Sequence, residues 1–270
     1  MYEFPLTIAK ICYILIVLTY FSILDIKYRD IPDKHAWASL IGAIILFLLS
    51  IPIDINYGLT MFAIYMLVSM LLGPLLFYGL YKIDMIGGAD VIVVAEISLL
   101  FPLPSIYKYT LFARELIMPI HLPPVLPILL YANLLIAVII PFNILYNLVK
   151  YKNIYRSLKT GLARKIILLA TAKPVKAKDY LILKHRYLLE EFKVTNEGIE
   201  RTIRTSFDIN EEYTDHQKLI RELISNGLLN PDDYIIITYG IPYIVPILLG
   251  TLLFMIFGDL VIQYLFLALS

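Results

Sequence analysis

The stretch SILDIKYRDIP, residues 22–32, closes a long apolar run and carries Asp25 at its end. The stretch IGGAD, residues 86–90, opens another apolar run and places Asp90 shortly after two glycines, with Ala89 between. An ionisable side chain at a membrane span is costly, which makes each carboxylate a functional-site hypothesis by default. Two carboxylates at one membrane depth therefore indicate a pair for acid–base chemistry at one face of a bilayer.

The composition predicts a polytopic membrane protein, an all-α bundle of transmembrane helices. Hydrophobic residues make up 60% of the chain, charged residues make up 17%, and the mean hydropathy is +0.78. A soluble domain has roughly 45–50% apolar and 25% charged residues. A span needs about 20 apolar residues. We mark six spans, at about 5–24, 35–53, 59–81, 91–103, 122–149 and 240–269, the fourth beginning back at the Gly87-Gly88 step.

The first apolar run is expected to remain in the protein as a helix. It has no basic region ahead of it and no small-residue cleavage site at its end, unlike a secretory signal. The single cysteine, Cys12, lies within this run and has no second cysteine for an intramolecular disulfide or a multi-cysteine zinc site. We expect Cys12 to serve in packing.

The distribution of Lys and Arg predicts the orientation, because short cytoplasmic loops hold the excess of these residues. With the N-terminus outside, twenty basic residues fall inside and three fall outside. Sixteen of the twenty lie in the long segment 150–221, which counts for little in this rule, and the short loops alone give four against three. An even number of spans then places both termini outside. The same orientation puts Asp25 and Asp90 at the cytoplasmic face.

Three regions follow from these patterns: residues 1–149 with five spans and both aspartates, a soluble module at 150–239, and the last span at 240–270. The module begins with eleven basic residues and one acid between Lys150 and Arg186. Apolar residues interleave with this charge at 163–169. Such a stretch beside a span is typical of a segment on anionic headgroups. Direct contact with a substrate stays open as the alternative.

The rest of the module has the pattern of a small α+β fold with an acidic balance. We predict strands at 180–183, 188–194, 199–203 and 233–238, a turn at 196–198, and a helix at 215–226 that ends at Gly227. The module contains no phosphate-binding loop, no metal-ligand cluster and no nucleophile–base pair. We expect it to position something rather than to catalyse.

The two aspartates fit a reaction in which one carboxylate activates water and a protonated partner polarises a carbonyl. Two carboxyl groups held close together share a proton and titrate as a unit, and this chemistry requires no metal or cofactor. Asp90 begins a helix and Asp25 ends one. Because the helix dipole favours an anion only at its N-terminus, we expect Asp90 to be the more anionic member.

Gly87 and Gly88 support this motif. Without a Cβ they let the backbone bend at the membrane edge and let an extended strand approach closely. A plain junction between a loop and a helix is the simpler interpretation of two glycines alone. The aspartate that follows at a span boundary strengthens the functional interpretation.

These residues resemble the type IV prepilin peptidase family of GxGD intramembrane aspartyl proteases, and in particular its archaeal branch, the preflagellin peptidases. The resemblance rests on Asp25 with Ile31-Pro32 downstream, on GGAD at 87–90, and on the proline-rich stretch 240–250 that leads into the last apolar run. It covers the whole layout of the chain. Ala89 stands where the strict pattern has its second glycine.

The resemblance implies an endopeptidase that removes the short basic leader peptide from archaeal precursor archaellins or pilins at the cytoplasmic membrane face. It implies that Asp25 and Asp90 are the catalytic pair and that Gly87, Gly88 and Ala89 support them. The partners would be these precursors and membrane lipids, with no nucleic acid. No cofactor or metal is expected, and the Cys-x-x-Cys pairs of the zinc loop in many bacterial relatives are absent.

Other acidic residues have simpler interpretations. Asp30, Asp33 and Asp84 lie in loops, where they are solvated or contact a basic leader. Glu96 lies on a different helix face from Asp90 and is expected to form a hydrogen bond inside the bundle. Asp259 is expected to serve in packing or at the interface.

The three asparagines of the fifth span, Asn133, Asn143 and Asn147, are expected to make interhelical hydrogen bonds. Two other functions stay open: a transporter with a carboxylate relay, and a non-catalytic membrane scaffold for pilus or archaellum assembly. The pattern also leaves open whether the two aspartates meet in the resting protein or only when a substrate binds.

Overall fold

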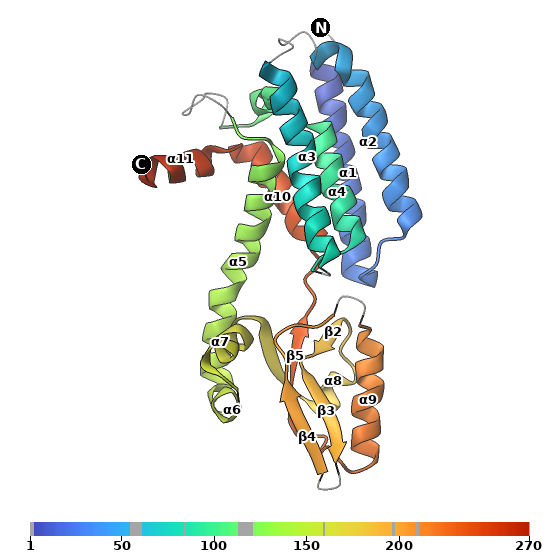
Figure 1. Cartoon of the computed structure of the whole chain (residues 1–270), viewed down its shortest axis with the longest axis vertical. Coiled ribbons are helices and arrows are strands. Elements are labelled where there is room, and N and C mark those ends of the chain that lie inside the picture. The colour runs from blue at the N-terminus through green and yellow to red at the C-terminus, as the bar shows by residue number, and fades with distance from the viewer. Residues whose placement is uncertain are drawn as a thin grey trace. The chain divides into compact units, whose positions relative to one another are not determined.

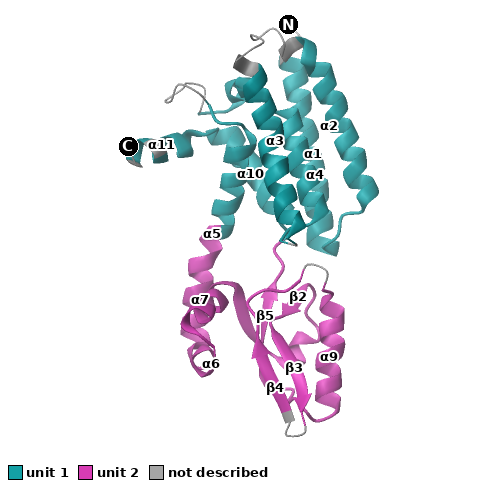
Figure 2. Ribbon diagram, viewed as in Figure 1, with its two compact units in different colours: residues 1–136, 242–270 teal, residues 137–241 magenta. Residues whose placement is uncertain are grey.

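The computed structural model describes residues 3–54, 61–83, 85–112, 121–158, 160–195, 198–208 and 211–269 (Figure 1). The chain divides into two compact units (Figure 2). Unit 1 consists of residues 1–136 and 242–270, and unit 2 consists of residues 137–241.

Unit 1 is helical. Its elements are α1 (Glu3–Tyr28), α2 (Asp33–Asp54), α3 (Met61–Lys82), α4 (Gly88–Leu100), the 3-10 helix η2 (Pro104–Tyr109), the first part of α5 (Val125–Lys150), α10 (Ile244–Phe257) and α11 (Leu260–Leu269). Among the described residues, four helices are long and apolar enough to cross a membrane: α1, α2, α3 and α5.

The expected count of six spans is not confirmed. Helix α4 has 13 residues, about 20 Å at 1.5 Å per residue, which is less than the roughly 30 Å of a hydrocarbon core. The last apolar run is divided at Gly258, whose φ of +56° is a conformation that favours glycine. Figure 1 shows α11 turning away from the direction of α10 at this point. Placement of the C-terminus outside therefore stays a prediction.

Helix α4 lies in the core of unit 1 and packs against α2 and α3. Its sequence is apolar on nearly all sides, which is the pattern of a buried helix. Val93, Val94 and Ile97 are fully buried there, together with the polar Glu96 and Ser98. Because α4 is buried on several faces, its N-terminus and Asp90 lie inside unit 1, near the ends of the neighbouring helices.

Close approach of α10 to α5 depends on Gly250. A Cβ at Gly250 would lie 2.5 Å from the carbonyl oxygen of Ile128 and 2.9 Å from the amide nitrogen of Ala132. Backbones can come this close only where one helix carries no side chain. This contact sets how closely α10 approaches α5, while the more extensive packing of α10 is against α1.

Unit 2 contains the end of α5 and a small sheet with helices on both sides. Strand β5 (Tyr234–Tyr239) is central, with β1 (Ala172–Lys176) and β2 (Arg186–Leu188) antiparallel on its two edges. Strands β3 (Glu190–Thr195) and β4 (Gly198–Ile203) form a separate antiparallel pair. The helices are α6 (Lys152–Ser157), α7 (Leu162–Thr171), α8 (Ala177–Tyr180) and α9 (Tyr213–Ser225).

Alternate residues of β5 face two different cores, as the two-residue period of a strand requires. Ile235 and Ile237 pack with residues of α8 and α9. Ile236 packs on the opposite side with Tyr155 of α6 and Leu168 of α7. The apolar run of β5 is thus covered on both faces.

Several predictions for the soluble module are confirmed: the strands at 199–203 and 233–238, and the helix that ends before Gly227, whose φ is +68°. The strand expected at 188–194 is present as β3 with the end of β2. The strand expected at 180–183 is wrong, since Tyr180 ends α8 and a turn follows. A short apolar run does not distinguish these structures. The turn predicted at 196–198 involves residues 196 and 197, which lie outside the described residues.

Strand β1 was not predicted from the sequence. It contains Pro174, which argues against a central strand because proline has no N–H to donate. The structure resolves this by placing β1 at an edge of the sheet, where one side of the strand needs no partner.

We predict that Gly250→Ala lowers the thermal stability of the protein, because the added methyl group collides with the backbone of α5. Overpacking of this kind costs about 1–3 kcal/mol. Thermal unfolding in detergent micelles measures the effect. Gly79→Ala in α3 is the control, since a Cβ there meets nothing within 4 Å. An unfolding midpoint for Gly250→Ala equal to that of Gly79→Ala would contradict this packing.

Candidate active site

Asp25 lies in the last turn of α1, partly buried. The N–H of Arg29 donates to the carbonyl oxygen of Asp25 at 3.1 Å, and Arg29 adopts φ +57°. A left-handed residue directly after a helix is a common way to end it. The chain then passes through Pro32 into α2.

The carboxylate of Asp25 accepts a hydrogen bond from a different helix. The backbone N–H of Ile244, the first residue of α10, donates to Asp25 Oδ2 at 3.4 Å. The first N–H groups of a helix have no partner within it and carry the positive end of its dipole. The C-terminal end of α1 disfavours an anionic Asp25, whereas the positive end of α10 favours one. The expectation that Asp90 is the more anionic member therefore stays a prediction.

Asp90 lies in the first turn of α4 and caps it. The N–H of Gly87 donates to Asp90 Oδ2 at 3.0 Å, and the N–H of Asp90 donates to the carbonyl oxygen of Gly87 at 3.2 Å. The carboxylate bond is the one that an acidic residue at the third helical position makes in a capping box. It holds the carboxylate of Asp90 at the N-terminus of α4.

The two glycines before Asp90 are not required by the local fold. Gly87 has φ −78° and ψ 157°, an extended conformation open to any residue. A Cβ on Gly87 would lie 3.5 Å from Asp90 Oδ2, and one on Gly88 would lie 3.8 Å from the ring of Tyr81. Both are ordinary van der Waals distances. The absence of side chains at these positions leaves space beside Asp90. Ala89 packs against the core.

Asp25 and Asp90 lie near enough to one another to interact electrostatically. Tyr243, the residue before α10, is also within electrostatic range of Asp90. Its hydroxyl donates to Asn133 Oδ1 of α5 at 3.3 Å, and its ring centroid lies 5.9 Å from that of Phe77 in α3. Unit 1 thus brings two carboxylates, a phenol and a helix N-terminus together.

The sequence did not identify Tyr243, Ile244 and Asn133 as parts of this site. The available signal was the proline-rich stretch 240–250 ahead of the last apolar run. That stretch indicated the start of a helix, but it contained no information about which side chain the helix would face.

The other acidic residues make different contacts from those of Asp25 and Asp90. Glu96 is fully buried, and the hydroxyl of Ser39 donates to its Oε1, which confirms the hydrogen bond expected inside the bundle. Asp30 and Asp33 are exposed. Asp84 lies outside the described residues. Within the described part of the chain, no group of three His, Cys, Asp or Glu side chains is arranged to hold a metal.

Asp259 is fully buried at the break between α10 and α11, which confirms its expected role in packing. His121 Nδ1 lies 3.2 Å from both carboxylate oxygens. Gln263 Nε2 donates to Oδ1 at 2.7 Å, and the N–H of Leu122 donates to Oδ2 at 3.1 Å. A buried carboxylate needs such partners. The cluster fixes the corner between the two helices.

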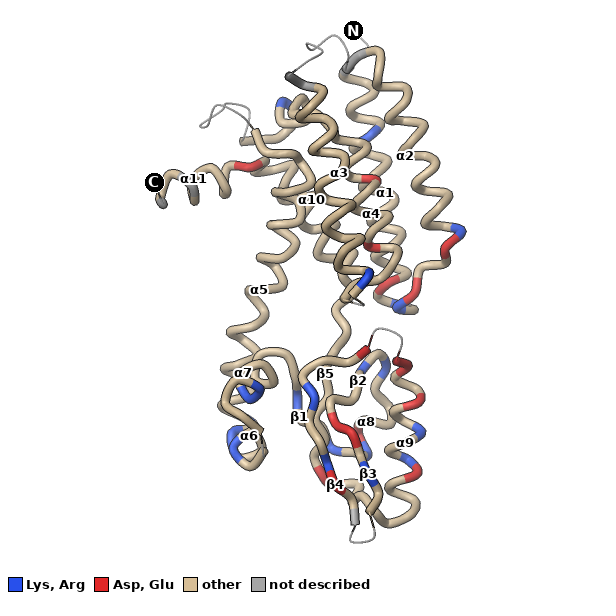
Figure 3. Tube along the Cα trace, in the orientation of Figure 1, with Lys and Arg blue, Asp and Glu red and all other residues tan. Residues whose placement is uncertain are grey.

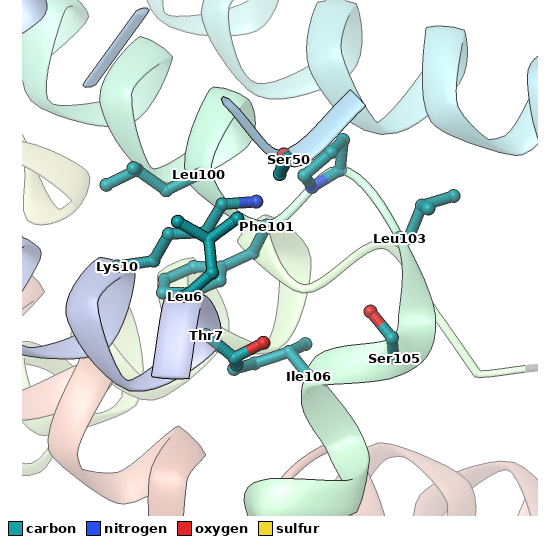
Figure 4. Close-up of a pocket in the computed structure, with 10 residues that line it drawn as sticks. Leu6, Thr7, Lys10, Ser50, Leu100, Phe101, Leu103, Ser105 and Ile106 are labelled. Carbon is teal, nitrogen blue, oxygen red and sulfur yellow. The ribbon is translucent and has the colours of Figure 1, made fainter. Parts of the chain in front are cut away.

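One pocket in unit 1 is distinct from the aspartates (Figure 4). Residues of α1, the end of α2 and the segment after α4 line it. The amino group of Lys10 points into it, on the side of Ser50. Lys10 precedes Asp25 by fifteen residues on α1, which is about 22 Å along a helix. The pocket therefore does not belong to the carboxylate pair.

Comparison with known families finds two matches along the chain. Residues 12–142 match the model of the type IV leader peptidase family. Residues 164–260 match the model of the archaeal peptidase A24 C-terminus, type II. The first match includes Asp25, Gly87, Gly88 and Asp90. No curated protein matches the chain.

We predict that Gly87→Ala and Gly88→Ala fold as stably as the unchanged protein or slightly better. An alanine that fits the native backbone restricts the unfolded chain, which stabilises a protein by about 0.4–1 kcal/mol. The measurement is the same thermal unfolding, with Gly250→Ala as the contrasting variant. A loss of stability as large as that of Gly250→Ala would show that the fold itself requires these glycines.

Proposed function

Because the chain belongs to the type IV leader peptidase family, we propose that it is a membrane-embedded aspartyl endopeptidase of the GxGD type. Family membership indicates a peptidase acting on pilin- or preflagellin-like precursors. The proposal adds the reaction: removal of a short basic leader peptide by a dyad of Asp25 and Asp90. It also places the protein in the cell membrane as a multi-pass protein, with this site at the cytoplasmic face.

The observation that supports the proposal is that two carboxylates from separate helices lie within electrostatic range of one another. Asp25 comes from the end of α1 and Asp90 from the start of α4, and the two interact electrostatically. One backbone N–H orients each carboxylate through its Oδ2 atom, from Ile244 and Gly87 respectively. These bonds position the pair without neutralising either carboxyl group.

A carboxyl pair of this kind performs peptide hydrolysis by sharing one proton. The protonated member donates a hydrogen bond to the oxygen of the scissile carbonyl. The ionised member removes a proton from water while the water oxygen bonds to the carbonyl carbon. The tetrahedral intermediate collapses as the C–N bond breaks and a proton passes to the leaving nitrogen. Both carboxyl groups return to their starting state.

The space beside Asp90 suits an extended substrate. Gly87 and Gly88 present no side chains there, so a peptide strand can approach the backbone closely. Asp30 and Asp33 are exposed after the end of α1. Their charge is complementary to that of a basic leader, and we assign them as contacts that align it. The excess of basic residues in the inner loops supports a cytoplasmic position for the site.

We predict that Asp25→Asn and Asp90→Asn each abolish processing of a precursor archaellin or pilin in a membrane-based cleavage assay. Loss of an acid–base group lowers the rate by about 100-fold to 10,000-fold. The amide oxygen of asparagine still accepts the N–H bonds from Ile244 and Gly87, so both variants are expected to fold. Thermal unfolding of the same preparations checks this.

Glu96→Gln is the matched control, because it removes a carboxylate that belongs neither to the pair nor to the proposed leader contacts, and it should retain cleavage. Asp30→Asn tests a proposed leader contact and should raise KM more than it lowers kcat. Full activity in either dyad variant would contradict the assignment of that residue. If the folded unchanged protein cleaves none of several precursors, a non-catalytic scaffold replaces the peptidase. Altered ion flux in the dyad variants would instead support a transporter.

A further inference from the structure

Helix α7 in unit 2 exposes an apolar face. Leu162, Ile166 and Ile167 are 76%, 53% and 44% exposed and lie on one side of the helix by its periodicity. On another side, Leu168 is fully buried in the core with Ile236. Packing inside unit 2 therefore accounts for Leu168 but leaves the opposite apolar face uncovered.

Two asparagines hold the C-terminal end of α7 beside α5. Asn143 Nδ2 donates to the carbonyl oxygen of Ala170 at 3.1 Å. Asn147 Nδ2 donates to the carbonyl oxygens of Leu169 and Ala172, both at 2.8 Å. These contacts confirm the hydrogen bonds expected of the two asparagines. They also fix α7 at a known level along α5.

That level lies near the end of an apolar candidate span. Helix α5 is an apolar candidate span of 26 residues, about 39 Å long, so it exceeds a hydrocarbon core of roughly 30 Å. Asn147 and Asn143 lie about 5 Å and 10 Å before its end at Lys150. Amphipathic helices that lie on a bilayer bury their apolar face to a depth of about 5–10 Å. In Figure 1, α7 is viewed nearly end-on beside α5, so it runs across α5 rather than along it.

The carbonyl groups at the end of α7 are satisfied by side chains. Besides the two asparagines, the Tyr155 hydroxyl donates to the carbonyl oxygens of Leu168 at 3.3 Å and Ala172 at 3.0 Å. The Thr238 hydroxyl donates to the carbonyl oxygen of Thr171 at 2.8 Å. The last carbonyls of a helix have no partner within it, and in contact with lipid they must find one in the protein.

Basic and aromatic side chains surround the same level. Lys150 Nζ donates to the Tyr146 hydroxyl at 3.1 Å and lies 5.4 Å from the ring centroid of Tyr151. Lys173 Nζ lies 5.4 Å from the ring centroid of Tyr146. Tyrosine and lysine at a span end are typical of the interface between hydrocarbon and headgroups. Figure 3 shows basic segments on α6 and α7, with no acidic segment on either helix.

We propose that α7 is an interfacial helix, which inserts Leu162, Ile166 and Ile167 into an anionic lipid bilayer beside α5 and so anchors unit 2 to the membrane. This role goes beyond the proposed peptidase activity and does not depend on it. The hydrogen bonds that hold α7 beside the apolar span α5, and the basic residues around it, favour lipid over a second copy of the chain or a protein substrate.

The test uses the full chain in lipid nanodiscs of phosphatidylcholine with phosphatidylglycerol. Cys12 is first replaced by serine, and single cysteines at position 166 or 167 then carry a polarity-sensitive fluorophore. Ile182→Cys is the matched aqueous control, because Ile182 is 81% exposed in the same unit but lies outside α7. Phe142→Cys on α5, where Phe142 is 67% exposed, is the control for contact with lipid.

We expect the labels at 166 and 167 to be quenched by spin-labelled lipids, as at 142, and to lose the quenching by aqueous iodide seen at 182. Equal iodide quenching at 166 and 182 would overturn the proposal. So would iodide protection that disappears on dilution of the protein in lipid, which indicates a second copy. Protection that appears only with added precursor indicates a substrate surface and also overturns it.

Photoreactive lipids applied to the unchanged chain provide a second measurement that requires no variant. Mass spectrometry should locate crosslinks on the peptide that contains residues 162–167 and on the end of α5. Crosslinks on α5 without any on α7 would contradict the proposal. Neither measurement uses cleavage as its readout, so each result is independent of the peptidase assignment.

Discussion

Polar groups inside an apolar helical bundle have no water to bond, so each must find a partner in the protein. This constraint organises unit 1 at both ends of α10. At the start of α10, the N–H of Ile244 meets the carboxylate of Asp25. Just after its end, the carboxylate of Asp259 contacts His121 and accepts hydrogen bonds from Leu122 and Gln263. Hydrogen bonds to the carboxylates of Asp25 and Asp259 therefore position α10, in addition to the contact at Gly250.

The candidate site follows from where helices end. The first N–H groups of α4 and α10 have no partners within their own helices, and each helix start lies beside an aspartate. Asp90 caps its own helix, whereas Asp25 receives its donor from a helix more than two hundred residues away in sequence. Helix ends inside a bundle are thus the places where a carboxylate can be held in an orientation useful for chemistry.

The same requirement for hydrogen-bond partners applies to the helix end in unit 2. Asn143, Asn147, Tyr155 and Thr238 provide donors for the last carbonyls of α7 and the start of β1. Unit 2 is joined to the rest of the chain at α5 and again after β5, where four residues separate the central strand from Ile244. The sheet is therefore connected directly to the segment that supplies a donor to Asp25.

The sequence by itself determined the features that depend on local pattern. Long apolar runs identified a membrane protein, local strand patterns identified β4 and β5, and the positions of Asp25 and Asp90 at run boundaries identified the candidate pair. Each of these signals lies within about twenty residues of chain, which is the length over which span length and periodicity act.

Only the tertiary structure decided which element meets which. In the tertiary structure the last apolar run is divided at Gly258, and the strand with Pro174 lies at a sheet edge. The first N–H of α10 donates to Asp25. The tertiary structure also buried Leu168 of α7 while leaving the opposite apolar face uncovered. Periodicity shows that a face is apolar, but the choice of what covers it depends on packing between segments far apart in the chain.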